Sequence, residues 1–153
     1  MCAGISFLID VVRGRDLDRF LTDDELDKKR KGDLVESFYW DAKPYLPVYE
    51  DDEVNLYPWG DREGRSGLPK TGWAKIESVR DGIWNAYSPK KVLIPSYAGY
   101  EKRHWFKTPQ GIQGIKVRIH NITRVYILTA KADRQFLRII GHDRMPMGEI
   151  IYN

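Results

Sequence analysis

The chain has 153 residues, the size of one ordinary domain, so two separately cored domains are not expected. Hydrophobic residues make up 42% of it and charged residues 31%, which excludes both a disordered chain and a membrane protein. No run approaches the roughly 20 apolar residues of a membrane-spanning helix, and the start of the chain lacks the features of a secretory signal. The composition predicts a single cytoplasmic domain over residues 1–153, in monomeric form.

Charge is unevenly distributed along the chain. Residues 1–53 carry 8 basic and 14 acidic side chains, a balance of −6, whereas residues 54–153 carry 17 and 8, a balance of +9. A basic, aromatic-rich body indicates a polyanionic partner such as nucleic acid, although solvated surfaces alone produce similar blocks.

The first half of the chain predicts one strand followed by helix and loop. Residues 5–12 form an apolar, β-rich run typical of a buried strand. Within residues 16–38, apolar residues recur at spacings of three and four, which predicts one or two helices broken near Gly32. Four prolines and several glycines between residues 41 and 70 predict loops with short strands.

The second half predicts mainly strands, because it is rich in β-branched and aromatic residues. The expected strands cover residues 73–79, 90–102, 104–108, 115–120, 123–132 and 147–152, with a short helix over 132–140. Lys116 and Arg118 alternate with apolar residues, as in a strand with one solvated basic face. The predicted fold class is α+β, a single domain dominated by antiparallel or barrel-like sheet with a few short helices.

Common catalytic signatures are missing from the sequence. It contains no phosphate-binding glycine loop, no dinucleotide-binding glycine motif and no HExxH or GxSxG motif. Its three histidines are far apart and its single cysteine excludes a disulfide framework and a cysteine-based zinc site. We expect no metal and no cofactor.

Cys2 is the first residue with distinctive chemistry. Removal of Met1 would give it a free amine beside its thiol, and such an aminothiol condenses with an aldehyde to an imine and then closes a thiazolidine ring. An α-amine with a pKa near 7.8 is roughly one-seventh neutral at pH 7, so it needs little activation. An inert, buried cysteine at the start of a strand is the alternative.

Two further residues suit proton transfer. Glu101 follows an apolar strand and Tyr100, and a carboxyl group against apolar surface acts as general acid or base. A solvated glutamate at a strand end is the alternative. His142 and Arg144 lie in the segment GHDRMP, where the histidine would move protons and the arginine would hold a phosphate.

These three segments, in this order, resemble the SRAP family (SOS response-associated peptidase), whose members cross-link to abasic sites in DNA. That family begins Met-Cys-Gly-Arg, and this chain begins Met1-Cys2-Ala3-Gly4. The segment VLIPSYAGYEK corresponds to the family's strand leading to Gly-Phe-Tyr-Glu-Trp. The segment YILTAKADRQFLRIIGHDRMP corresponds to its closing strand, helix and His-(Asn or Asp)-Arg-Met-Pro motif. The resemblance spans nearly the whole chain, except that residues 10–45 match little.

The resemblance implies a function and a set of site residues. The mature amino-terminal Cys2 would attack the aldehyde of an abasic site in single-stranded DNA and form a thiazolidine DNA–protein cross-link, with lyase activity through the same imine. Glu101 and His142 would transfer protons in that reaction. The DNA-binding residues would be Arg144, Lys75, which replaces a family arginine, Trp59, which would stack or wedge against a base, and Trp73.

The sequence also departs from the family. Trp73 replaces a functional asparagine, Lys102 replaces the tryptophan that follows the motif glutamate, and the arginine after Cys-Gly is absent. Two other functions therefore stay open: a non-catalytic nucleic-acid-binding module with this fold, and a thiol peptidase in which Cys2 cleaves peptide bonds and removes Met1.

Overall fold

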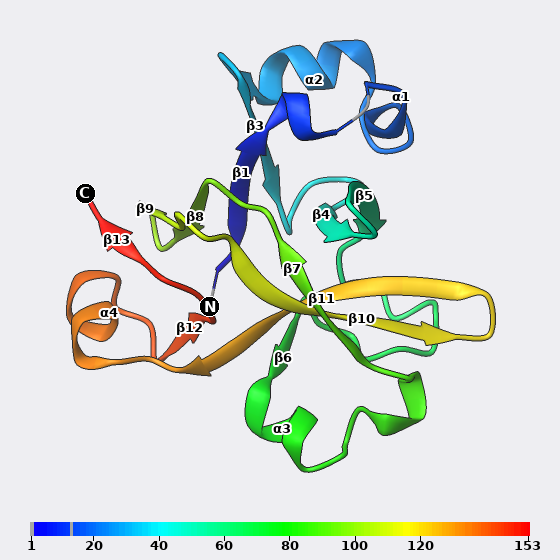
Figure 1. Cartoon of the computed structure of the whole chain (residues 1–153), viewed down its shortest axis with the longest axis vertical. Helices are drawn as coiled ribbons and strands as arrows, with labels where there is room; N and C mark the ends of the chain where they lie inside the picture. The colour runs from blue at the N-terminus through cyan, green and yellow to red at the C-terminus, as the bar shows by residue number, and fades with distance from the viewer. Residues whose placement is uncertain (1, 13) are drawn as a thin grey trace.

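The computed structural model describes residues 2–12 and 14–153, and their strands form two mainly antiparallel sheets (Figure 1). The first sheet contains the start and the end of the described chain. Its strand order is β13 (Ile151–Tyr152), β9 (His104–Lys107), β8 (Ala98–Glu101), β1 (Gly4–Leu8), β3 (Leu34–Phe38) and β2 (Arg30–Lys31).

The second sheet is built around the long β10–β11 hairpin. Its strand order is β12 (Arg144–Pro146), β11 (Ile122–Lys131), β10 (Ile112–Ile119), β7 (Lys90–Ile94), β4 (Tyr45–Glu50) and β5 (Glu53–Pro58), with β6 (Trp73–Lys75) parallel to β11. An isolated bridge between Trp59 and Val125 joins the end of β5 to β11. The predicted antiparallel α+β domain is confirmed, but the strands described here do not close into a barrel.

One hydrophobic cluster belongs to both sheets. Ile5, Phe7 and Phe106 enter it from the first sheet, and Tyr45 and Ile94 enter it from the second, all fully buried. Successive residues of a strand face opposite sides, so β1, β7 and β11 each contribute alternate side chains to this core. The shared core makes the two sheets one folded unit.

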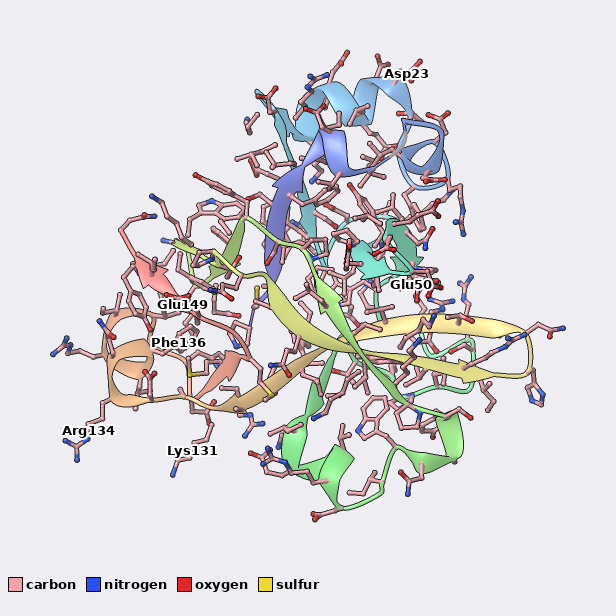
Figure 2. The ribbon with its side chains drawn as sticks, viewed as in Figure 1. Asp23, Glu50, Lys131, Arg134, Phe136 and Glu149 are labelled. Atoms are coloured by element: carbon pink, nitrogen blue, oxygen red, sulfur yellow. The ribbon has the colours of Figure 1, made fainter. Side chains whose placement is uncertain are left out.

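The helices are short and lie around the sheets. They are α1 (Gly14–Leu17), α2 (Asp23–Lys29), α3 (Ile76–Arg80) and α4 (Arg134–Ile139), with 3₁₀ turns at Ile9–Val11 and Asn85–Tyr87. Asp133 caps α4 by accepting a hydrogen bond from the backbone N–H of Phe136. Figure 2 shows the Arg134 side chain pointing away from the body, whereas Phe136 is buried in the core. None of the helices described is long and apolar enough to cross a membrane.

The helix expected over residues 16–38 is wrong beyond Lys29. Residues 30–38 form β2 and β3, joined by a two-residue turn in which Gly32 adopts a φ of +62°. The spacing of Leu34 and Phe38 fits a helix, but it also fits alternate positions of a strand, and pairing with β1 selects the strand.

Three other element boundaries differ from the expected ones. The first strand stops at Leu8, residues 73–79 divide into β6 and α3, and β12 occupies a segment expected to be loop. The segment 90–102 contains two strands separated around Pro95, which cannot donate a ladder hydrogen bond. The solvated face of β10 is confirmed, because Arg118 is exposed while Val117 is buried.

Candidate functional site at the start of the chain

Cys2 lies directly before β1 and packs against β8. Its Sγ donates a hydrogen bond to the Gly4 carbonyl oxygen at 3.0 Å, and the side chain has no exposed surface. A Cβ placed on Gly99 would lie 3.0 Å from this sulfur and 2.5 Å from the Phe106 ring. Gly99 therefore admits both groups because it has no side chain.

Glu101 shares a face of β8 with Gly99, since residues two apart on a strand point the same way. Its side chain is buried, with 7% of the residue exposed, and its Oε2 has no hydrogen-bond partner among the described residues. Burial raises the pKa of the Cys2 thiol to about 12, and the negative charge of Glu101 adds to this shift. At neutral pH the sulfur is therefore a protonated thiol, on the face of β8 that also carries Glu101.

Trp73 fixes the backbone of Cys2. Its Nε1 donates a hydrogen bond to the Cys2 carbonyl oxygen at 2.9 Å, and its ring lies 4.7 Å from that of Tyr39 between centroids. The backbone N–H of Tyr39 in turn donates to the Ala3 carbonyl oxygen at 3.0 Å. The aromatic cluster of Tyr39, Trp59 and Trp73 thus anchors the main chain at Cys2 and Ala3.

The expectation that Trp59 stacks or wedges against a base does not fit its position. Only 1% of Trp59 is exposed, and its Nε1 donates to the Gly72 carbonyl oxygen at 2.9 Å. Its ring packs against Tyr39 and Trp73. Trp59 supports the aromatic cluster from within the core, because the apolar surroundings and the satisfied indole N–H favour burial.

Lys75 and Arg144 lie on two strands, β6 and β12, that both pair with β11. Lys75 pairs with Thr129 in the parallel β6–β11 ladder and lies on the same face of β6 as Trp73. The Arg144 Nη2 donates to the Thr129 carbonyl oxygen at 2.9 Å. The sheet thus brings together two basic residues that are 69 positions apart in the sequence.

Arg144 also binds a carboxylate. Its Nη1 and Nη2 donate to Oε1 and Oε2 of Glu77 at 3.2 Å and 2.8 Å, a two-point ion pair. The Arg144 guanidinium lowers the pKa of the Glu77 carboxyl group. A phosphate at Arg144 would therefore have to compete with Glu77.

His142 lies in the loop between α4 and β12, next to the β8–β9 turn. The Lys102 Nζ donates to the Gly141 carbonyl oxygen at 2.7 Å, which ties this loop to the residue after Glu101. The His142 Nδ1 accepts a hydrogen bond from the backbone N–H of Arg144 at 3.0 Å, so the neutral ring carries its proton on Nε2. The Asp143 Oδ1 lies 3.3 Å from the same Nδ1.

The structure places most of the predicted residues in two groups and one loop. Cys2, Glu101 and Trp73 are in one group, Lys75 and Arg144 flank Thr129, and the His142 loop is joined to the first group through Lys102. Removal of Met1 concerns a residue outside those described. In the described part of the chain, no three histidine, cysteine or acidic side chains are grouped in a way that could hold a metal ion.

Sequence reasoning missed the supporting roles of Gly99, Tyr39 and Glu77. The period of two in a strand could have placed Gly99 beside Glu101. Nothing in the sequence relates Glu77 to Arg144, because their contact depends on how β6, α3 and β12 are arranged around β11.

No protein-family model matches this chain, and no curated protein shows significant sequence similarity to it. The fold and site define the chain as a two-sheet, β-rich domain with a buried thiol beside a buried carboxylate at its amino-terminal strand. The functional inference rests on this geometry and on the motifs of the sequence.

Proposed function

We propose that this chain is an SRAP-type protein, with a fold of that type, which captures abasic sites in single-stranded DNA through Cys2 after Met1 has been removed. The observation that carries the proposal is the position of the Glu101 carboxyl group. Its Oε2 is buried and has no hydrogen-bond partner among the described residues, and it belongs to the face of β8 against which the Cys2 sulfur packs. A buried carboxylate oxygen without a hydrogen-bond partner costs stability, and such groups are concentrated at functional sites, which supports a role for Glu101 in proton transfer.

The proposed chemistry balances without a cofactor. The Cys2 amine adds to the ring-opened C1′ aldehyde, and loss of one water gives an imine. The thiol sulfur then bonds to the imine carbon, while the thiol proton passes to the nitrogen and closes the thiazolidine. Glu101 would carry this proton, because the high pKa of the thiol leaves it protonated until a base acts on it.

The other residues would bind the DNA and assist the sugar. His142 would protonate or deprotonate the sugar oxygen during ring opening. Lys75, which is exposed, would contact a phosphate, and Arg144 would contact another by exchanging Glu77 for it. Trp73 would set the position of Cys2 in place of the family asparagine.

The test is a cross-linking assay. Protein whose Met1 removal has been verified by intact mass is incubated with a single-stranded oligonucleotide that holds one abasic site, without borohydride, and run on a denaturing gel. We expect a shifted band in the wild type, no band in Cys2→Ala and slower formation in Glu101→Gln. Glu149→Gln is the matched control, because it removes one exposed carboxylate elsewhere.

Two results would contradict this mechanism. A band that persists in Cys2→Ala would exclude the aminothiol, and a wild-type rate in a folded Glu101→Gln variant would exclude the carboxylate.

A second candidate function is non-catalytic nucleic-acid binding. It is favoured by the complete burial of Cys2 and by the ion pair that occupies Arg144. In that case the same assay gives salt-sensitive binding and no covalent band. The raised pKa of Cys2 argues against the third reading, a thiol peptidase, because the attacking species in such enzymes is the thiolate.

A further inference from the structure

A basic pocket lies beside the candidate site. It has a volume of about 330 Å³, within the usual range for small-molecule sites. Five cationic side chains and two acidic ones line it, a balance of +3: Arg19, Lys43, Arg62, Arg65 and Arg124 against Asp61 and Glu63.

Two of the cations are fixed in the wall of the pocket. The Arg62 Nη1 donates to the Tyr39 carbonyl oxygen at 2.6 Å, and the Arg124 Nη1 donates to the Gly60 carbonyl oxygen at 3.0 Å. Each guanidinium has five N–H donors, so these bonds leave donors for a second partner. Fixed guanidinium groups favour phosphate binding, because little further ordering is needed.

The other three cationic residues lie at the edge of the pocket. Arg19, Lys43 and Arg65 are all exposed, and the Arg65 side chain, 82% exposed, pairs with the exposed Glu63 at 3.1 Å. Such an exposed pair contributes little energy and is easily exchanged for an anion.

The buried acid in the lining is already compensated. Asp61 accepts hydrogen bonds from the backbone N–H of Ser66 at 3.0 Å and from the Ser66 hydroxyl group. Burial would raise the pKa of Asp61, but these hydrogen bonds outweigh it and keep that pKa low. Ser66 thus satisfies the Asp61 carboxylate, and the negative charge of Asp61 is already counted in the balance of +3.

The pocket also has an apolar part, and one of its residues belongs to the aromatic cluster that packs near Cys2. Pro44 and Pro58, both partly exposed, provide the accessible apolar surface. Phe20 and Trp59 close the lining from the core, and the Arg19 guanidinium lies 5.3 Å from the centre of the Phe20 ring. Trp59 packs against Trp73, which binds the Cys2 carbonyl oxygen.

We propose that this pocket binds one nucleotide unit. Its phosphate would lie between the fixed arginines, Arg62 and Arg124, and the exposed cations Lys43 and Arg65, with its base against the two prolines. The chemistry combines an anion with a flat apolar group, and it is shared by a free nucleotide and a nucleotide within a strand. The assignment to a strand rests on the proposed function.

The test compares two double variants that each remove two positive charges. Lys43→Gln with Arg65→Gln alters the pocket, and Lys90→Gln with Lys91→Gln alters exposed positions on β7 outside it. Binding of an intact single-stranded oligonucleotide is measured by fluorescence anisotropy at several salt concentrations. For the pocket variant, we expect the slope of log affinity against log salt concentration to fall by about 1.4, and the affinity at low salt to fall at least about fivefold. For the control, we expect the affinity to fall by less than about twofold. Circular dichroism checks that both variants are folded.

A second arm uses thymidine monophosphate, with calorimetric detection. Binding to the wild type that is lost in the pocket variant, with unchanged oligonucleotide binding, would assign the pocket to free nucleotides. Equal losses in the two double variants, or unchanged binding of both ligands in the pocket variant, would overturn the proposal. Because the oligonucleotide has no abasic site, failure of covalent capture at Cys2 leaves these results interpretable.

Discussion

At the scale of single residues, Cys2 shows how burial controls reactivity. Its sulfur is enclosed by Gly4, Gly99 and the Phe106 ring, and a carboxylate lies on the same side of β8. Both features favour the neutral thiol over the thiolate. The proposed amine-first reaction suits this environment, because in that reaction the sulfur acts only after the imine has formed.

The raised pKa of Cys2 predicts a pH-dependent stability. The folded thiol has a pKa of about 12, whereas the ordinary value is 9.0. Its contribution to the free energy of unfolding is therefore complete below pH 9 and is lost as the pH rises toward 12. At pH 10 the wild type should have lost about 1.4 kcal/mol of unfolding free energy that Cys2→Ser does not lose. Urea unfolding of both proteins at pH 7 and pH 10 measures this difference. Equal pH dependence in the two proteins would show that the thiol titrates normally.

Trp73 provides a second prediction at this scale. Trp73→Phe keeps an aromatic ring but removes the hydrogen bond to the Cys2 carbonyl oxygen, which should cost about 0.5–1.5 kcal/mol of unfolding free energy. It should also accelerate alkylation of the single cysteine, since the chain start is less firmly held. Trp105→Phe is the control, because Trp105 is also partly buried and its indole N–H makes no hydrogen bond to the residues that the structure describes. Equal alkylation rates in the two variants would contradict the anchoring role.

At the scale of elements, the strand β11 organises the basic part of the site. β6 and β12 pair with its opposite edges, and this arrangement brings Lys75 and Arg144 to Thr129. The helix α3 then presents Glu77 to Arg144. The availability of Arg144 for an anion is therefore set by α3, an element that carries no predicted site residue.

Glu77→Gln should release Arg144. We expect affinity for an intact single-stranded oligonucleotide to rise about two- to fivefold at low salt, with a salt slope steeper by about 0.7, because one more guanidinium can meet a phosphate. Fluorescence anisotropy at three salt concentrations provides the measurement. Glu149→Gln changes the net charge equally without touching Arg144, so an equal gain in that variant would show a general charge effect.

The strength of the alternation in each strand determined whether the sequence predicted that strand correctly. Long strands with clear alternation, such as β10, were found correctly, because one face must be buried. The β2–β3 hairpin was missed, because its apolar residues are few and their spacing fits two periods. Only pairing of β3 with β1 distinguishes the alternatives.

At the scale of the whole molecule, the two sheets depend on each other. Their inner faces contribute to one core cluster, and the candidate site lies where β8 of one sheet approaches β6 and β12 of the other through Trp73 and Lys102. Figure 1 shows the beginning of β1 near this junction. A site built in this way requires both sheets to be folded.

The shared core predicts a single unfolding transition. Far-ultraviolet circular dichroism and tryptophan fluorescence should give the same urea midpoint, because neither sheet can bury its inner face alone. Val48→Ala, in the second sheet, should lower both midpoints together by removing a fully buried side chain from the common core. Separate midpoints for the two probes would indicate two independent units.

The sequence by itself determined the β-rich fold class, the charge asymmetry and the residues that carry distinctive chemistry. These properties are local: they follow from composition, from a period of two and from short motifs such as GHDRMP. Tertiary structure alone decided that Cys2 is buried beside Glu101, that Trp59 supports the core, and that Glu77 occupies Arg144. Each of these outcomes depends on contacts between residues far apart in the chain. The pairing of strands determines which residues come into contact, and no local pattern encodes that pairing.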